Sequence, residues 1–235
     1  MSSIENLTLF ITPPHPCSYL EDRDATTVFI DPTTTISENL YSELNEVGFR
    51  RSGPNFYKPH CKNCKACIAT RVPINWFQPS RKHRRILNKN SDLTLLSCDT
   101  INTEEHYSLY AKYISVRHDD GDMFPPSQEQ FEQFIGGMTA FSCFTEFRLE
   151  GKLIALAVAD DVASSRSAVY TFFDPDQHKR SLGTYAILAA IETCRAEQRE
   201  YLYLGYWIQE CRKMSYKIDF RPIELYVEGC WQTLR

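Results

Sequence analysis

Apolar and polar positions alternate along this chain with two different periods, and the period changes near residue 140. Before that point the pattern is mainly helical. We expect helices over Ser37–Val47, over residues 81–89 after a Ser80 cap, and over residues 103–117 after a Thr103 cap. A further capping box predicts a helix that begins after Ser127.

From residue 141 onward the pattern predicts strands. FSCFTEFRL alternates, KLIALAVADD indicates a buried strand, and SAVYTFF indicates another. DPDQHKR is expected to be a loop, after which Ser181 begins a long helix. YLYLG is then a short strand, and PIELYVEGC is the last one. Residues 1–35, rich in Pro and Thr, are expected to be irregular.

This order of elements predicts a mixed α+β fold. An antiparallel meander that feeds a helix crossing to a further strand is the plan of the GNAT-type acyltransferase core. We therefore expect a GNAT-like catalytic lobe over residues 101–235. An N-terminal lobe over residues 1–100 would carry a cluster of cysteines and a basic segment.

Composition limits the compartment and the partners. The longest apolar run, LIALAVA, is far too short to span a bilayer, and the N-terminus lacks the pattern of a secretory signal. Nine cysteines without an export signal favour a reducing cytoplasm. We expect a cytoplasmic protein with no membrane partner. The net charge of −4 argues against a general nucleic-acid binder, and no DNA partner is expected.

The positive charges are nevertheless clustered. Residues 47–91 contain eleven Lys and Arg and no Asp or Glu. This segment is either a solvated basic face or a phosphate-binding surface, since clustered cations release counterions from a nucleic acid. A helix after Ser80 would place Arg81, Arg84 and Arg85 on one face.

Three evenly spaced cysteines, in HCKNCKAC, suggest a metal site. Cys61, Cys64 and Cys67 would bring three thiolates together on one loop, and the lysines between them would favour the thiolate form. A zinc ion or an iron–sulfur cluster needs a fourth ligand. Cys17 is the best candidate, with His15 and His60 as alternatives; half-buried free thiols are the other interpretation. The remaining cysteines fall on apolar faces and are expected in the core: Cys98, Cys143, Cys194, Cys211 and Cys230.

A strand–loop–helix pattern at residues 170–188 can bind an anion. Arg180, Ser181 and Gly183 stand at the start of the helix, where free backbone N–H groups and the helix dipole favour negative charge. The phosphate could belong to CoA or to the end of a tRNA. CoA-dependent enzymes carry a small residue where this chain has Tyr185, which would obstruct the pyrophosphate. No P-loop and no G-x-S-x-G elbow is present, which favours an acyl donor that is already activated.

Aromatic and basic residues interleave in residues 201–222. Tyr206 and Trp207 could stack on a base, and Lys213 and Lys217 could neutralise phosphates. An ordinary strand followed by an amphipathic turn explains the same pattern equally well.

Four segments together resemble the arginyl-tRNA–protein transferase family and, by length and the Cys17 segment, its bacterial branch. They are GFRRSGPNFYKPHCKNCKACIATRVPINWFQPSRKHRRILNK, YISVRHDDGDM, YTFFDPDQHKRSLGTYAILAAIE and YLYLGYWIQECRKMSYKIDFRPIE. The resemblance implies transfer of leucine from Leu-tRNA to proteins that begin with Asp or Glu, which marks them for degradation in the N-end rule pathway. The choice of leucine over arginine rests on the resemblance alone.

This reaction assigns roles to particular residues. Asp174 is our candidate proton acceptor, and Tyr170 could align the ester or stabilise the oxyanion. A cation must bind the acidic side chain, and the candidates are Arg81, Arg84 and Arg85, then Arg50 and Arg51. The chemistry requires no cofactor. Two other functions stay open, namely a CoA-dependent N-acetyltransferase and a non-catalytic metal and RNA-binding module.

Overall fold

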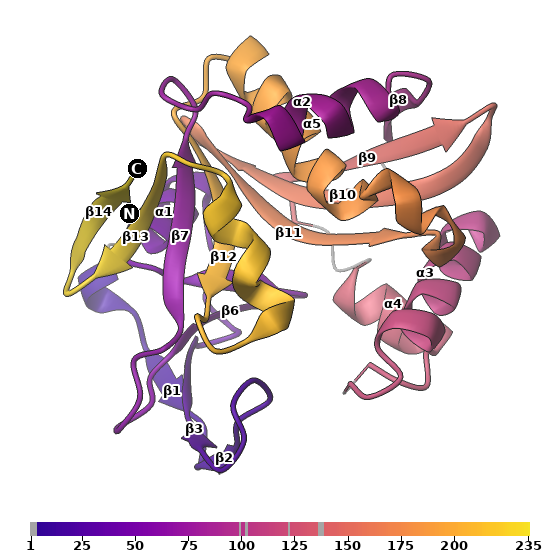
Figure 1. The fold of residues 1–235 in the computed structure, drawn as a ribbon. Helices are drawn as coiled ribbons and strands as arrows, with labels where there is room; N and C mark the ends of the chain where they lie inside the picture. The colour runs from indigo at the N-terminus through magenta and orange to yellow at the C-terminus, as the bar shows by residue number, and fades with distance from the viewer. Residues whose placement is uncertain (1–3, 99, 102, 122, 136–138) are drawn as a thin grey trace.

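The computed structural model describes residues 4–98, 100–101, 103–121, 123–135 and 139–235. An eight-stranded sheet organises this part of the chain, in the order β14-β13-β7-β12-β11-β10-β9-β8. A four-stranded sheet, in the order β1-β4-β6-β5, and a two-stranded sheet of β2 and β3 lie beside it (Figure 1). The expected mixed α+β class is confirmed.

The strands of the large sheet are β7 (Ile68–Pro73), β8 (Thr94–Cys98), β9 (Ser142–Leu149), β10 (Lys152–Val162), β11 (Ser165–Phe173), β12 (Tyr201–Trp207), β13 (Ile223–Val227) and β14 (Cys230–Leu234). The shorter strands are β1 (Leu9–Ile11), β2 (His15–Pro16), β3 (Asp24–Ala25), β4 (Thr27–Ile30), β5 (Arg50–Ser52) and β6 (Asn55–Pro59). The α-helices are α1 (Glu38–Glu46), α2 (Arg81–Lys89), α3 (Glu104–Arg117), α4 (Gln128–Phe134) and α5 (Leu182–Ala196). The 3-10 helices are η1 (Ile4–Asn6), η2 (Pro175–Arg180) and η3 (Arg212–Asp219).

Side-chain caps fix the start of four helices, as the sequence predicts. Ser37, Ser80, Thr103 and Ser127 each accept a hydrogen bond from a backbone N–H in the first turn of the helix that follows. The predicted meander β9-β10-β11, the crossing helix α5 and the parallel strand β12 are also present. These elements make up the GNAT-like core.

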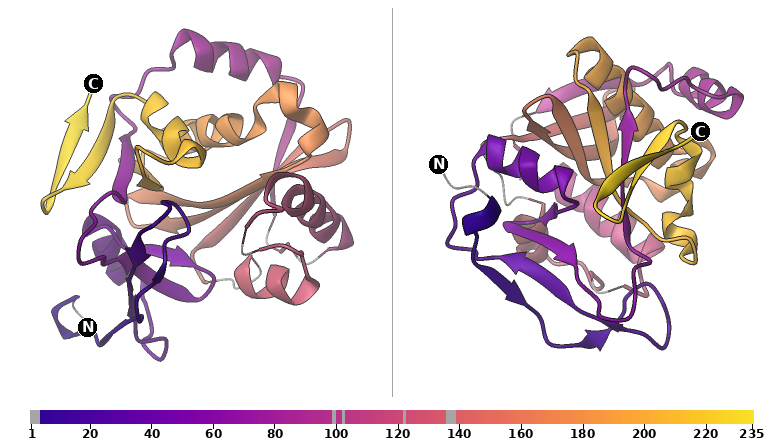
Figure 2. Two further views of the ribbon diagram at one scale, coloured as in Figure 1. Left: turned by 60° about the horizontal axis from the view of Figure 1, so that its bottom comes forward. Right: turned by 90° about the vertical axis from the view of Figure 1, so that its left-hand side faces the viewer.

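Helices cover both faces of the large sheet (Figures 1 and 2). α2 and α5 pack on one face in a core that includes Ile86, Leu188 and Ile191. α3 and α4 pack on the other face over β9, β10 and β11, in a core rich in aromatic rings. None of the helices in the described ranges has both the length and the apolar character needed to cross a bilayer.

Two local predictions are wrong. Residues 175–180 form the 3-10 helix η2 rather than a loop. The N-terminal segment is not irregular, because residues 9–30 contribute β1 to β4. The last predicted strand is confirmed as β13, which pairs with a further strand, β14, in a hairpin. The division into two lobes at residue 100 stays a prediction. Two strands that precede residue 100, β7 and β8, belong to the large sheet.

The parallel pair β11 and β12 separates part-way along its length. The two strands pair only over Ser165 to Ser167 and Tyr201 to Tyr203. Beyond that point β11 continues along β10 and β12 continues along β7, and Figure 1 shows the two strands running apart. Backbone groups at the point of separation are therefore free to bind something other than the neighbouring strand.

Candidate functional site

The side chain of Arg50 lies where β11 and β12 separate. Arg50 comes from β5 and is only 5% exposed. Its Nη1 donates to Ser167 Oγ at 2.8 Å, and its Nη2 donates to the carbonyl oxygen of Ala168. Gly205, beside a register shift of β12, lies next to it and has φ of +80°, which L side chains rarely adopt; a Cβ there would make only an ordinary contact, at 3.6 Å from Arg50 Nε. Arg50 thus occupies the gap in the parallel pair.

A buried lysine lies in the same region. Lys217 of η3 is 5% exposed, and its Nζ donates to the carbonyl oxygen of Tyr206 at 2.5 Å. The Sδ atom of Met214 lies 3.0 Å from the same nitrogen. Burial, followed by the positive charge of Arg50, lowers the pKa of Lys217 to about 7. Two cationic side chains therefore act on each other inside the protein.

Neither cation has a carboxylate partner among the residues that the structure describes. The other buried arginines are all paired. The shortest contacts join Arg51 to Asp160, Arg71 to Glu224 and Arg166 to Asp161, each at 2.6 Å. Because an isolated buried charge is costly, an unpaired pair of cations indicates a binding site.

The end of β11 carries the predicted catalytic residues. Asp174 is buried and accepts from Lys112 Nζ at 2.6 Å and from the backbone N–H of Asp176. Burial alone would raise the pKa of Asp174, but these donors outweigh it, and the pKa lies below its ordinary value. Asp174 is therefore ionised at neutral pH.

Two buried donors without partners lie on the separated strands. The hydroxyl of Tyr170, on β11, and the indole Nε1 of Trp207, at the end of β12, have no hydrogen-bond partner among the described residues. The Tyr170 ring packs against Tyr113 and Phe134, and burial raises the pKa of its hydroxyl. Unsatisfied buried donors are rare in proteins, so both are available to a substrate oxygen.

Tyr206 does not offer the stacking face expected of it. Its ring is buried, and its hydroxyl donates to the carbonyl oxygen of Gly48 at 2.7 Å. Lys213 is exposed but pairs with Asp120 at 2.9 Å, which joins η3 to the loop after α3. Lys217, being buried, is likewise withdrawn from any surface contact with a phosphate.

The predicted anion turn lies directly against the end of α2. Arg180 makes a two-point ion pair with Asp92 at 2.8 Å and also donates to the carbonyl oxygen of Lys89. Ser181 precedes α5 with φ of +56°, and its side chain makes no capping hydrogen bond, contrary to expectation. The basic helix and the helix mouth at Gly183 therefore belong to one continuous region.

Tyr185 does not obstruct this helix mouth. It is buried, and its ring packs 5.6 Å from that of Phe147 in the core. The argument that its side chain excludes a pyrophosphate is therefore wrong.

The basic segment at residues 47–91 is divided between surface and interior. Arg81, Arg84 and Arg85 of α2 are exposed, as predicted. Arg51 and Arg71 are buried in ion pairs and cannot serve a ligand without breaking them. The α2 part of the segment is thus a cationic surface, and Lys62 and Lys65 between the cysteines are exposed as well.

Two family models match the chain in the same order as these features. The N-terminal model of arginine-tRNA-protein transferase matches residues 15–85, and the C-terminal model matches residues 105–227. Together they cover most of the chain. The chain belongs to the arginine-tRNA-protein transferase family.

Full-length relatives of this transferase family member carry a more specific name. An aspartate/glutamate leucyltransferase of Saccharophagus degradans is 53% identical over 234 residues, covering 99% of each chain. One of Pseudomonas aeruginosa (strain LESB58) is 50% identical and covers 100% of each. Among solved structures, FemX is similar over 70% of this chain and 59% of its own, at 10% identity with a TM-score of 0.46.

The cysteines of the family's N-terminal segment lie near one another. Burial raises the pKa of Cys67 to about 12, and Cys17, Cys61 and Cys64 act in the same direction through their charges. The lysines were expected to lower the thiol pKa values and favour the thiolate, but at Cys67 the pKa is raised and the protonated thiol is favoured. Cys64 Sγ accepts from Arg23 at 3.5 Å. The donor chemistry suits a thiophilic metal, although no three of these sulfur atoms, all within the described ranges, lie within 4.8 Å of one another.

A fifth cysteine joins this region from the C-terminal part of the transferase. Cys211, expected in the core, is half-buried and acts electrostatically on Cys67 and on Lys217. No sequence pattern connects it to the other four, because it lies 144 positions after Cys67 and meets it only through the fold.

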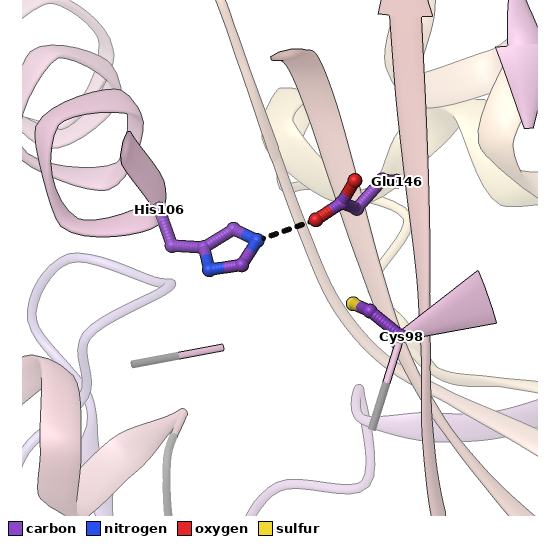
Figure 3. Close-up of side chains that lie close together, drawn as sticks. All are labelled: Cys98, His106 and Glu146. Atoms are coloured by element: carbon purple, nitrogen blue, oxygen red, sulfur yellow. Dashed lines mark hydrogen bonds and ion pairs between the residues drawn. The ribbon is translucent and has the colours of Figure 1, made fainter. Parts of the chain in front are cut away.

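One other group could in principle hold a metal. Figure 3 shows His106 of α3 and Glu146 of β9 pointing toward each other, with Cys98 of β8 beside them. His106 Nε2 lies 2.8 Å from Glu146 Oε1, and Arg148 Nε donates to the other carboxylate oxygen at 2.6 Å. Both oxygens are thus engaged and a guanidinium lies beside them, which opposes a cation. The group is explained as a polar clamp between α3 and the sheet.

Proposed function

We propose that this chain is an aspartate/glutamate leucyltransferase, which moves leucine from Leu-tRNA to the α-amino group of proteins that begin with Asp or Glu. One observation carries the proposal. The parallel strands β11 and β12 separate around two buried cations, Arg50 and Lys217, that have no carboxylate partner in the described ranges, in a chain whose full-length relatives bear that name. An acceptor with an acidic first residue fits such a site.

The reaction needs little chemical assistance. The α-ammonium of the acceptor first loses one proton to solvent or to a nearby acceptor. The neutral amine then attacks the carbonyl carbon of the leucyl ester, an amide bond forms, the bond to the ribose oxygen breaks, and a second proton of the nitrogen passes to that oxygen. An α-amino group has an ordinary pKa of about 7.7–8.0, so roughly a tenth of it is neutral at pH 7. Orienting the ester and the amine can contribute about 7–11 kcal/mol, more than a dedicated base provides.

The separated strands offer groups for this orientation. The unpartnered hydroxyl of Tyr170 and the indole N–H of Trp207 are donors suited to the ester carbonyl and to the oxyanion that develops on it. Asp174, whose pKa is low, is a weak base, and we assign it the fixing of the end of β11, through Lys112 and the backbone N–H of Asp176, rather than contact with the amine.

The donor tRNA requires a cationic surface outside the site. The exposed arginines of α2 provide one, and the end of this helix contacts the Arg180 turn at the start of α5. We assign Arg81, Arg84 and Arg85 to the tRNA rather than to the acidic side chain, because exposed cations suit a phosphate backbone. Lys213 would contribute only after releasing Asp120.

The cysteines are assigned a structural role. Cys17, Cys61, Cys64 and Cys67 would hold a zinc ion or an iron–sulfur cluster, which would order the N-terminal segment and take no part in aminoacyl transfer. The substrates place the protein in the cytoplasm, where charged tRNA and the clients of the N-end rule pathway occur.

A transfer assay with matched donors and acceptors tests the proposal. Labelled Leu-tRNA and Arg-tRNA are each incubated with peptides that begin with Glu, Asp or Ala and are otherwise identical. We expect leucine on the Glu and Asp peptides only. Arginine transfer at a comparable rate would mean that the enzyme does not select Leu-tRNA as its donor. Transfer from neither tRNA would refute the proposal. A parallel reaction with acetyl-CoA tests the N-acetyltransferase alternative.

A further inference from the structure

We propose that Arg50 and Lys217 together form the receptor for the side-chain carboxylate of the acceptor's first residue. This inference rests on the proposed function, because it takes an acidic N-terminus as the ligand. It assigns substrate selection to two residues that lie 167 positions apart and meet only at the gap between β11 and β12.

Counted over the described residues, the interior carries an excess of positive charge at this place, which an anion would neutralise. Asp160 is the buried carboxylate connected to Arg50, through Ser167 and Tyr41, but Arg51 already binds both of its oxygens at 2.6 and 2.7 Å. Arg51 and Asp160 therefore cancel, and the charge of Arg50 is left over. Lys217 adds to it whenever it is protonated. A bound carboxylate would neutralise this excess, whereas an empty site leaves it exposed to a low-dielectric interior.

Arg50 retains the donors that a carboxylate needs. A guanidinium has five N–H groups, and the contacts of Arg50 within the described chain use one from Nη1 and one from Nη2. Those two bonds fix the plane of the group against β11. The remaining N–H groups keep the planar fork geometry that binds a carboxylate through two parallel hydrogen bonds. Lys217 can turn a further N–H toward the same ligand.

The site selects a small ligand. Both cations are 5% exposed, so a ligand must enter the protein to reach them. Tyr216, which precedes Lys217 in η3 and is 42% exposed, borders the same region. The first side chain of an acceptor must in any case come close to the reacting ester, because it is attached to the carbon that carries the amine. A tRNA phosphate lies on a broad duplex that cannot enter the protein, so it is expected to bind the exposed arginines of α2 instead.

A comparison of acceptors tests the receptor directly. The variants are Arg50→Gln, Arg50→Lys and Lys217→Met, with Arg195→Gln as control, because Arg195 lies on α5 and pairs with Glu192 on the surface. Each enzyme is given a Glu-initiated and a Gln-initiated peptide of otherwise identical sequence. We expect Arg50→Gln and Lys217→Met to reduce kcat/KM for the Glu peptide by roughly 10–100-fold while the low rate with the Gln peptide changes little. Arg50→Lys should restore part of the preference.

The result that overturns the proposal is an unchanged preference for Glu over Gln in both variants. A rise in KM for Leu-tRNA with the preference intact would also overturn it, by assigning the cations to the tRNA. Binding of a fluorescent Glu peptide without tRNA separates this inference from the proposed function. Loss of that binding in the variants supports the receptor even if the wild type transfers another amino acid. If Arg50→Gln does not fold, as judged by its melting curve, Lys217→Met decides, since Met keeps the apolar stem of the side chain.

Discussion

Lys112 on α3 places its Nζ 2.6 Å from Asp174 Oδ1 at the end of β11, and the same nitrogen lies 2.6 Å from Asp176 Oδ2. The helix that covers the aromatic core is thereby tied to the end of the strand that carries Tyr170. Asp174 side-chain atoms are 5% exposed, whereas those of Lys112 are 40% exposed. A buried carboxylate held by a half-exposed cation therefore fixes the end of β11 against α3.

Asp174→Asn should therefore reduce kcat more than KM. The amide keeps the shape and can still accept from Asp176, but it loses the charge that holds Lys112. We expect kcat to fall by about tenfold with KM for Leu-tRNA unchanged, measured in single-turnover transfer to a Glu peptide.

Lys112→Met separates function from structure at this pair. It removes the ion pair and leaves the Asp174 charge in place, so kcat should fall by no more than about tenfold. Equal losses in the two variants would support the role of the pair in fixing the end of β11, whereas a much larger loss in Asp174→Asn would contradict it.

The exposed arginines of α2 should govern the salt dependence of tRNA binding. The combined variant Arg81→Gln, Arg84→Gln, Arg85→Gln should weaken Leu-tRNA binding and lower the slope of log K against log salt concentration by up to about three. Filter binding at several salt concentrations measures this slope. The melting temperature should change little, because the three side chains are exposed and the contact of Arg84 Nη1 with the carbonyl oxygen of Pro79, at 2.7 Å, is also exposed.

Arg195→Gln serves as the matched control for α2, since it removes one surface arginine elsewhere. A slope that drops equally in this variant would mean that net charge, and not the α2 face, sets the affinity. An unchanged slope in the combined variant would place the tRNA on a different surface.

Local sequence signals predicted the elements that have local causes. Ser37, Ser80 and Thr103 mark helix starts because a capping side chain bonds within its own first turn. The place of β7 between β12 and β13 could not be predicted in this way, because strand pairing joins residues more than a hundred positions apart. Ser181 was expected to cap α5 on residue type alone, but its positive φ turns the backbone away from that geometry.

The site was predicted as a set of residues and not as an arrangement. From charge and spacing, Arg50 is predicted to bind a carboxylate and Lys217 to neutralise a phosphate, so the two residues are not predicted to act together. The burial of both residues is what indicates a binding site, and burial is known only once the chain has folded. Trp207 was chosen for its ring, whereas the structure draws attention to its unpartnered N–H. The sequence likewise does not predict Cys211 as a neighbour of the cysteine cluster, because only the fold brings these distant parts of the chain together.

The cysteine cluster should bind a thiophilic metal. Protein purified without oxygen is expected to contain zinc, or iron with labile sulfide, and Cys61→Ser and Cys64→Ser should each reduce the content. Cys230→Ser is the control, because Cys230 is exposed on the terminal hairpin. Elemental analysis and a labile-sulfide assay measure the result. A metal-free preparation with full transfer activity and normal stability would remove the ligand assignment.

The last prediction concerns the stability of the protein between neutral and alkaline pH. Lys217 has a pKa of about 7 in the folded protein against an ordinary value of 10.5. Between these two values the unfolded chain binds a proton at Lys217 that the folded protein does not. Stability then rises with pH, because it rises wherever the unfolded state binds more protons. This group therefore opposes folding most strongly below pH 7 and ceases to do so above pH 10.5.

Lys217→Met isolates this contribution from every other titrating group. Thiols with raised pKa, such as Cys143 and Cys194, act in the opposite direction, but they are present in both proteins and cancel in the comparison. The free energy of unfolding of the wild type, minus that of Lys217→Met, should increase by about 2 kcal/mol between roughly pH 7.5 and 9, as measured by urea denaturation under reducing conditions. A difference that does not change with pH would mean that Lys217 keeps an ordinary pKa, and that the interior at the gap between β11 and β12 already holds the anion we assign to the substrate.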